Sequence, residues 1–407
     1  MPKLLLINSA KNYGSTGKIV EQIGLLANSK SWETCLVHSA RYNRPSQLKC
    51  IKAGNKFSEN LHALMALLFD RQGLESRCTT RNVIKQIKKF NPDVVHIHNI
   101  HGYFLNYPLF FKYLIESNVP VVWTMHDCWS FTGHCTYFDM VGCDKWKNEC
   151  HHCANLANYP KSLFFDRSTK NFKLKKQLFT KLNNIIMVPV SEWLAEMTRQ
   201  SYMSKFKIHV INNGIDLNIF RVKETHLRTD LHLENRFVVL GVSSNGFTGR
   251  KGFDDFIKLA SLLPSDYQII MIGLHANELK RLPSNILARM QTTNVNELVD
   301  YYNLADVFIN PTYSDNFPTT NIESLACGTP VITYQTGGSP EAVDEKTGVV
   351  VKKGDIQSLA NAIIKMKEHP LSSLDCRNRA FNKYNKDKRF EEYIKLYNSL
   401  LKHNNMK

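Results

Sequence analysis

Short apolar runs alternate with amphipathic stretches along almost the whole chain. The runs of the first half that we expect to form buried strands are 4–7, 34–38, 93–98, 119–125 and 184–191. Those of the second half are 237–244, 267–272, 306–310, 331–334 and 348–351. Stretches with a helical spacing of apolar residues separate them, for example 83–90, which Asn91 and Pro92 end. This βαβα alternation predicts an α/β fold with doubly wound parallel sheets.

Two such halves fit the length of 407 residues, which suggests two or three domains. We predict a first domain over 1–205, a second over 206–385, and a terminal amphipathic helix within 386–407. The segment 128–153 interrupts the alternation, so we expect it to be an insert. No apolar run approaches the roughly 18 residues that cross a membrane, and the N-terminus is typical of a strand. We therefore expect a cytoplasmic protein.

Histidines gather where two predicted strands end. His96, His98, His101 and His126 lie at or just past the ends of the runs 93–98 and 119–125. Parallel sheets bind ligands at the carboxyl ends of their strands. One histidine in such a place commonly completes a local hydrogen bond and nothing more, but four from two strands predict a polar pocket.

The stretch 315–330 carries the densest candidate chemistry of the second half. It follows the apolar run 306–310, and Pro318 with Thr319 and Thr320 opens a short helix. Backbone N–H groups at a helix start bind anions, and a nearby carboxylate, Asp315 or Glu323, can take ribose or sugar hydroxyls. The spacing of Thr320 and Glu323 equally fits a capping box, in which Glu323 only bonds the start of the helix.

Glycine-bearing loops follow the first strand of each half. Gly14 and Gly17 can let backbone N–H groups approach a phosphate or a sugar, although both can be plain turn residues. Arg250 and Lys251 stand between glycines at a strand-to-helix turn, where two cations suit a diphosphate. Solvated loop charges are the alternative there. Neither loop has the spacing of a Walker A motif.

Three phrases give the chain a resemblance to a known family. Residues 315–331, with Asp-Asn-Phe-Pro and then Glu-x-x-Ala-Cys-Gly-Thr-Pro-Val, resemble the Glu-x7-Glu motif of the retaining glycosyltransferase family 4. Asp315 stands where that family has its first glutamate. The phrases at 124–134 and 210–220 also resemble this family, in the version of bacterial colanic-acid, O-antigen and capsule type transferases. The resemblance implies a GT-B fold of two facing Rossmann-like domains, the first binding acceptor and the second nucleotide sugar, with the last helix packing back on the first.

The resemblance also implies roles for single residues. Glu323 would hold ribose hydroxyls, and Asp315 and His126 would hold donor-sugar hydroxyls near the reacting carbon. Lys251, with Arg250 beside it, matches the turn that binds the diphosphate. The other donor-binding candidates are Gly14, Gly17, Phe317, Pro318, Thr319 and Thr320. Catalysis would require no cofactor.

Five of the ten cysteines lie between residues 128 and 153. Four of them, which we call the cysteine cluster, have a spacing that can supply thiolates to one structural zinc ion: Cys135, Cys143, Cys150 and Cys153. The Cys-x2-Cys pair is the strongest part of this pattern. An insert packed by aromatic side chains, with free cysteines, is the alternative.

The net charge of +16 is uneven along the chain. Residues 1–200 hold 26 Lys and Arg against 14 Asp and Glu, and the remainder holds 26 against 22. Residues 161–181 interleave lysines with Phe and Leu, which predicts an amphipathic helix with Lys173, Lys175 and Lys176 on its polar face. Such a helix fits an anionic membrane surface and equally the solvated face of an ordinary domain. No nucleic-acid-binding motif accompanies the charge, so we expect no nucleic-acid partner.

These observations favour a hexosyltransferase-type enzyme that moves a sugar, with retention, from a nucleotide diphosphate sugar to an acceptor hydroxyl in bacterial surface polysaccharide biosynthesis. The expected partners are the nucleotide sugar, a glycan or lipid-linked glycan acceptor, and an anionic surface at the inner face of the cell membrane. Two alternatives remain at this point. One is a nucleotide-sugar epimerase on the same fold, and the other is a non-catalytic binding module stapled by zinc.

Overall fold

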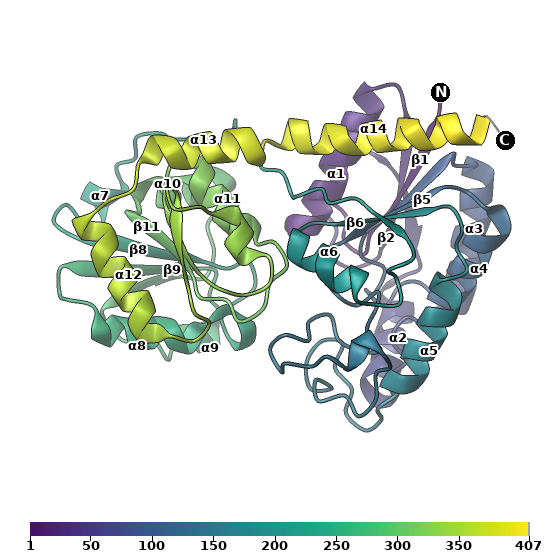
Figure 1. Ribbon diagram of the computed structural model, residues 1–407, viewed down its shortest axis with the longest axis horizontal. Helices are drawn as coiled ribbons and strands as arrows, with labels where there is room; N and C mark the ends of the chain where they lie inside the picture. Colours follow the sequence, from purple (N-terminus) through teal and green to yellow (C-terminus); the bar gives the residue numbers. More distant parts are fainter. Residues whose placement is uncertain (406–407) are drawn as a thin grey trace. The chain divides into compact units, whose positions relative to one another are not determined.

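The computed structural model describes residues 1–405, which form two compact α/β units (Figure 1). The first unit comprises Met1–Asn212 together with the residues from Arg389 on, and the second comprises Asn213–Lys388. Residues 406 and 407, which the predicted terminal segment includes, lie outside the described residues. Both units contain one parallel sheet, so the predicted α/β architecture is confirmed. No helix within the described residues combines the length and apolar character that crossing a bilayer requires.

The sheet of the first unit has seven strands in the order β3-β2-β1-β4-β5-β6-β7. Their bounds are β1 (Lys3–Ile7), β2 (Glu33–Ser39), β3 (Lys49–Ala53), β4 (Val94–Ile97), β5 (Val121–Met125), β6 (Ile185–Pro189) and β7 (Lys207–Ile208). Its helices are α1 (Gly14–Ser29), α2 (Lys56–Phe69), α3 (Arg77–Phe90), α4 (Tyr107–Ser117), α5 (Ser168–Phe179) and α6 (Glu192–Arg199), with a short 3-10 turn η1 (Lys145–Lys147). The strand order reverses between β1 and β4, which is the place where doubly wound sheets bind ligands.

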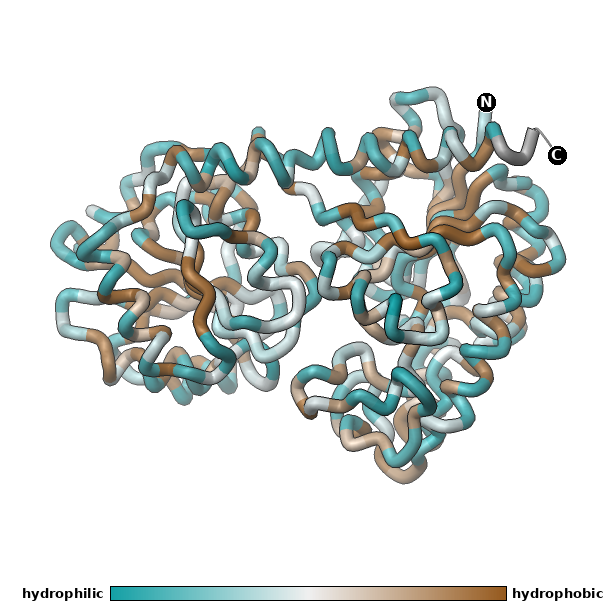
Figure 2. Tube along the Cα trace, viewed as in Figure 1, coloured by the Kyte–Doolittle hydropathy of each residue, from teal (hydrophilic) through white to brown (hydrophobic). Residues whose placement is uncertain are grey.

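The core of the first unit joins the two ends of the chain. Leu4 and Leu6 of β1 pack in one cluster with Phe390, Tyr393 and Tyr397 of α14 (Lys386–Asn405). The strands carry continuous apolar runs, visible as brown segments in Figure 2, because helices cover both faces of a parallel sheet. The final helix is therefore part of the core of the first unit.

The second unit has six parallel strands in the order β10-β9-β8-β11-β12-β13. Their bounds are β8 (Phe237–Val242), β9 (Tyr267–Ile272), β10 (Ile286–Arg289), β11 (Val307–Asn310), β12 (Val331–Tyr334) and β13 (Gly348–Val351). Its helices and 3-10 turns are α7 (Leu227–Asp230), η2 (Gly249–Lys251), α8 (Phe253–Leu262), α9 (Ala276–Leu279), α10 (Val295–Leu304), α11 (Thr319–Ala326), η3 (Ser339–Ala342), α12 (Ile356–Glu368) and α13 (Ser373–Lys383). Here the order reverses between β8 and β11.

The predicted helix over 161–181 is wrong in extent and in orientation. The helix α5 begins only at Ser168, and Lys175 on it is buried instead of lying on a polar face. Its ammonium group donates to the carbonyl oxygens of Trp129 (2.7 Å) and Thr132 (3.1 Å) and lies 3.5 Å from the centre of the Trp129 ring. Burial lowers the pKa of Lys175 to about 7. A lysine buried by such partners looks, in the sequence, like any other lysine of an amphipathic helix.

Candidate functional site

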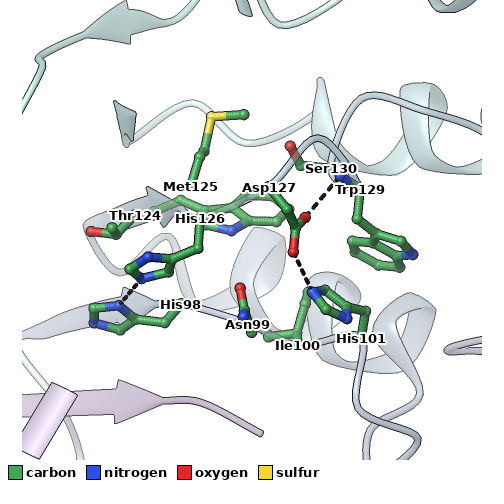
Figure 3. A pocket seen from close by; sticks show the side chains of 11 residues that line it. His98, Asn99, Ile100, His101, Thr124, Met125, His126, Asp127, Trp129 and Ser130 are labelled. Carbon is green, nitrogen blue, oxygen red and sulfur yellow. Dashed lines mark hydrogen bonds and ion pairs between the residues drawn. The ribbon is translucent and has the colours of Figure 1, made fainter. Parts of the chain in front are cut away.

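A small hollow opens at the carboxyl ends of β4 and β5 in the first unit (Figure 3). Its walls are formed by His98, Asn99, Ile100, His101, Trp123, Thr124, Met125, His126, Asp127, Trp129 and Ser130. The backbone N–H of Ser9, which follows β1, donates to the carbonyl of Asn99 (2.8 Å). The hollow therefore lies beside the point where the strand order reverses, as the histidines at the strand ends predict.

Three of the predicted histidines are linked to one another and to the final helix. His98 Nδ1 lies 3.0 Å from His126 Nε2, and the two rings stack (Figure 3). His96 bonds the hydroxyl of Thr124 with one ring nitrogen (2.7 Å) and the hydroxyl of Tyr397 with the other (2.6 Å). Burial lowers the pKa of His126 to about 4, and it lowers the pKa values of His96 and His98 as well. These rings are neutral near pH 7 and can hydrogen-bond hydroxyl groups.

The fourth histidine is paired with a carboxylate. His101 Nε2 lies 2.7 Å from Asp127 Oδ2, and the backbone N–H of Trp129 donates to Asp127 Oδ1 (2.9 Å; Figure 3). Burial alone would raise the pKa of Asp127, but the charge and hydrogen bond of His101 outweigh it and lower the pKa. The hydroxyl of Tyr159 donates to the carbonyl of His101 (2.8 Å). The hollow thus presents neutral imidazoles on one side and a hydrogen-bonded carboxylate on the other.

Gly14 and Gly17 lie at the start of α1 in the same unit. Gly14 has a φ of +65°, which glycine adopts without strain. A Cβ on Gly17 would come within 3.3 Å of both the carbonyl oxygen of Ala10 and the backbone nitrogen of Asn12. The backbone conformation at Gly14 and the close packing at Gly17 therefore each favour glycine without any ligand, and the donor-binding role of both residues stays a prediction.

The second unit brings three predicted residues into one charged cluster. Lys251 Nζ lies 2.6 Å from Asp315 Oδ2, and Arg250 Nη1 lies 3.1 Å from the same oxygen. Burial alone would raise the pKa of Asp315, but the charges of Lys251 and Arg250 outweigh it and hold the pKa at about 2. Gly252 has a φ of +75°, and a Cβ there would meet the carbonyl oxygen of Pro311 at 2.3 Å. This close approach fixes the turn after β8 against the loop after β11, where the strand order reverses.

The position at which helix α11 begins excludes the capping box as the role of Glu323. Its N-cap is Pro318, and no side chain in the described part of the chain caps it, so the helix begins too early for Thr320 to be the cap. Glu323 Oε2 instead accepts a hydrogen bond from the hydroxyl of Tyr302 (2.9 Å). Burial, together with the charge of Glu323, raises the pKa of Tyr302. Glu323 is therefore held by a tyrosine from α10, which the sequence pattern did not indicate.

The other donor-binding candidates of this unit lie at the start of α11. Phe317 is buried, and its ring packs 5.6 Å from that of Tyr384. Thr319 and Thr320 form the first turn of the helix. The buried side-chain amide of Asn321 accepts at Oδ1 from Asn310 Nδ2 (2.7 Å) and donates from Nδ2 to Ser339 Oγ (3.0 Å), which ties the helix to β11 and η3.

The members of the cysteine cluster are all free thiols. A hydrogen bond between Cys135 and Cys153 lowers the pKa of Cys153 and, with burial, raises that of Cys135. Cys150 Sγ accepts from the backbone N–H of Gly133 (3.2 Å). Among residues 1–405, no group of three His, Cys, Asp or Glu side chains is placed to hold a metal ion together. The zinc ion stays a prediction.

Solved structures define the class of fold. The chain superposes on a sucrose-phosphate synthase from Thermosynechococcus elongatus with a TM-score of 0.74 at 18% identity, over 99% of this chain and 100% of that one. It superposes on Anabaena Alr3699/HepE in complex with UDP-glucose with a TM-score of 0.68 at 14% identity, over 98% and 99%. With its two parallel-sheet units, the protein has the GT-B fold.

Sequence comparisons define the class of enzyme. The model of the glycosyl transferases group 1 matches residues 225–395, and that of Glycosyltransferase Family 4 matches 56–219. The putative colanic acid biosynthesis glycosyl transferase WcaC of Escherichia coli K12 is 26% identical over 334 residues, or 76% of this chain and 77% of that protein. The capsular polysaccharide biosynthesis glycosyltransferase CapM of Staphylococcus aureus is 29% identical over 241 residues, 53% of this chain and 62% of that protein. The protein is a glycosyltransferase, and these findings do not favour an epimerase or a non-catalytic module.

Proposed function

We propose that the protein is a retaining hexosyltransferase that uses a nucleotide diphosphate sugar to extend a bacterial surface polysaccharide. The observation that carries this proposal is the cluster of Arg250, Lys251 and Asp315 at the strand-order reversal of the second unit. Two of the structural neighbours are complexes with UDP and with UDP-glucose. The names of WcaC and CapM support colanic acid or capsule synthesis as the setting.

In this proposal the second unit supplies the positive charge that the leaving nucleotide needs. Lys251 and Arg250 bind the diphosphate, and the N–H groups at the start of α11 add to the stabilisation of the negative charge that develops on it. These groups take the place of a bound metal ion. Asp315 is ionised at neutral pH because its pKa is near 2, so it can accept hydrogen bonds from hydroxyls of the donor sugar.

Glu323 binds the ribose hydroxyls in this proposal, and Tyr302 positions it. A carboxylate that already accepts from a buried tyrosine is fixed in direction before the donor arrives, which lowers the entropic cost of binding. In the first unit, neutral His126 donates to or accepts from a sugar hydroxyl. The leaving phosphate itself accepts the proton of the acceptor hydroxyl, and the sugar is transferred with retention.

The test is a transfer assay with a panel of UDP, GDP and ADP sugars that carry a mass label, with and without lipid-linked glycan acceptors. We expect labelled sugar on the acceptor, and nuclear magnetic resonance of the product should show the anomeric configuration of the donor. A product of inverted configuration would refute retention. A labelled isomer of the donor that forms without acceptor would identify an epimerase instead.

We further propose that the acceptor is a glycan linked to a lipid diphosphate, and that the enzyme works as a peripheral protein at the inner face of the cell membrane. The uneven charge supports this, because the surplus of Lys and Arg in residues 1–200 favours approach to an anionic surface. The helix α5 alone does not provide the contact, since Lys175 is buried.

A further inference from the structure

The first unit exposes a group of large apolar side chains that its core does not use. Phe57, Leu61 and Leu64 project from α2, and Leu163, Phe164 and Phe165 lie in the segment before α5; we call these six the apolar surface. Between 47% and 77% of each of these side chains is exposed. Single exposed apolar residues are ordinary on a protein, but a cluster of this size indicates a contact with something outside the chain.

The two parts of the apolar surface are joined in the fold. The residues of α2 are spaced i, i+4 and i+7 and so form one stripe, while Glu59, His62 and Ala66 face the interior. The backbone N–H of Leu163 donates to the carbonyl of Leu67 in α2 (2.7 Å).

The end of α2 holds the second part of the surface in place. The rings of Phe69 and Phe165 lie 5.4 Å apart. The carboxylate of Asp70 accepts from the backbone N–H of Arg167 (2.8 Å), and its carbonyl accepts from the side chain of Asn171 (3.0 Å). The apolar side chains are thus presented by an ordered surface that ends at the start of α5.

The charges on the same segments are almost all positive. The exposed cations there are Lys56, Lys161, Lys170, Lys173 and Lys176. Of the acids, Glu59 and Asp70 are buried, and Asp166 accepts hydrogen bonds from the backbone N–H groups of Cys153 (2.7 Å) and Ser168 (2.8 Å). Only Lys173 has an acidic partner, Glu149 at 2.9 Å, among the ion pairs of these segments in the described residues.

We propose that the apolar surface inserts into the head-group region of an anionic lipid bilayer. Phe and Leu beside lysines are typical of elements that lie in a membrane interface, where rings enter the acyl boundary and ammonium groups meet anionic lipids. Protein–protein interfaces, in contrast, are depleted in lysine. This proposal rests on the lipid-linked acceptor proposed above, and it adds the part of the fold that meets the lipid.

The experiment is co-sedimentation of the full chain with vesicles of phosphatidylcholine that contain increasing phosphatidylglycerol. The triple variant F57S/L61S/F164S replaces only exposed side chains, so its fold should be kept. The matched control L262S/M290S/L374S removes three exposed apolar side chains of the second unit. We expect the first variant to need at least about tenfold more lipid for half-maximal binding, and the control to bind like the unaltered protein.

Three outcomes would overturn the proposal. The first is vesicle binding that the triple variant leaves unchanged, and the second is equal binding to vesicles of pure phosphatidylcholine. The third is a dimer in sedimentation analysis that the triple variant dissolves, because the occupant would then be a second copy of the chain. Titration with UDP, measured on the same samples, separates this test from the sugar-transfer proposal, since the substituted residues lie outside the second unit that we propose binds the donor.

Discussion

Replacing Lys251 by methionine tests whether the charged cluster binds a diphosphate. The variant keeps the apolar stem and removes the ammonium group that lies 2.6 Å from Asp315. Affinity for UDP should fall, whereas affinity for uridine should change little, because uridine carries no phosphate. A hydrogen bond to a charged group contributes about 1.5–3 kcal/mol, which corresponds to a loss of roughly tenfold to a hundredfold in UDP affinity.

The structure adds a second reason for the loss. Without Lys251, only Arg250 remains to offset the negative charge of Asp315, and a carboxylate with less compensation repels the incoming phosphates. The shift of the Asp315 pKa from 3.8 to about 2 corresponds to about 2 kcal/mol of stabilisation, which Lys251 and Arg250 share. We therefore expect a decrease of about 1 kcal/mol in the free energy of unfolding and an intact fold.

Isothermal titration with UDP and with uridine measures both affinities, and D315N is the matched comparison. That variant removes the internal anion and keeps both cations, so it should bind UDP at pH 7 no more weakly than the unaltered protein. The reasoning is refuted if the lysine variant loses UDP and uridine equally, or if D315N loses UDP affinity as strongly as the lysine variant does.

Three further predictions concern Glu323, the titration of Asp315 and the cysteine cluster. E323A should reduce UDP and uridine binding alike, since it removes the proposed ribose contact, while Y302F should reduce both by a smaller factor. Calorimetry on both variants would show whether Tyr302 positions the Glu323 carboxylate. Normal binding by E323A would show that Glu323 does not bind the ribose. The stabilisation from the ionised Asp315 carboxylate should be complete above about pH 4 and lost as the pH falls through about 2, because folding depresses the pKa of Asp315. The difference in unfolding free energy between the unaltered protein and D315N should therefore shrink by about 2 kcal/mol over that range. If the cysteine cluster holds a structural zinc ion, the purified protein should contain about one equivalent, and chelation should lower its melting temperature without a selective loss of UDP binding. Metal-free protein with an unchanged melting temperature would end that hypothesis. H134A would show whether His134 takes part, because buried Asp70 holds its Nδ1 at 2.7 Å and its Nε2 has no hydrogen-bond partner among the described residues.

The sequence pattern predicts the sheets well because buried parallel strands need continuous apolar runs. Leu4, Leu5 and Leu6 are recognisable for this reason, and so is the run 306–310 that precedes the charged cluster. The edge strands β3 and β10 were missed. Each contains exposed or polar residues, such as Lys49 and Arg289. An edge strand has a neighbouring strand on one side only, so fewer of its side chains are buried and need to be apolar.

The site could be predicted only as far as short motifs reach. Short motifs identify Arg250, Lys251 and Asp315 as candidates. The ion pairs among them, however, depend on the folding of the second unit, because Lys251 and Asp315 are 64 residues apart along the chain. No sequence pattern identifies Tyr302 or Tyr397 as part of a site. A tyrosine on a helix is ordinary, and its partner, Glu323 or His96, becomes known only when the helices are placed.

The position of α14 in the sequence determines when the core of the first unit can be completed during synthesis. The second unit is one uninterrupted stretch, whereas the first consists of two stretches that the second unit separates along the chain. The core of the first unit includes Phe390, Tyr393 and Tyr397, which are synthesised after the whole of the second unit, and the hydroxyl of Tyr397 bonds His96 beside the pocket. A nascent chain therefore carries an incomplete first unit until the residues after Lys388 have been added. A stop codon shortly before residue 390 would remove the α14 side chains from the cluster that holds Leu4 and Leu6, so the defect would lie in the half that was made first.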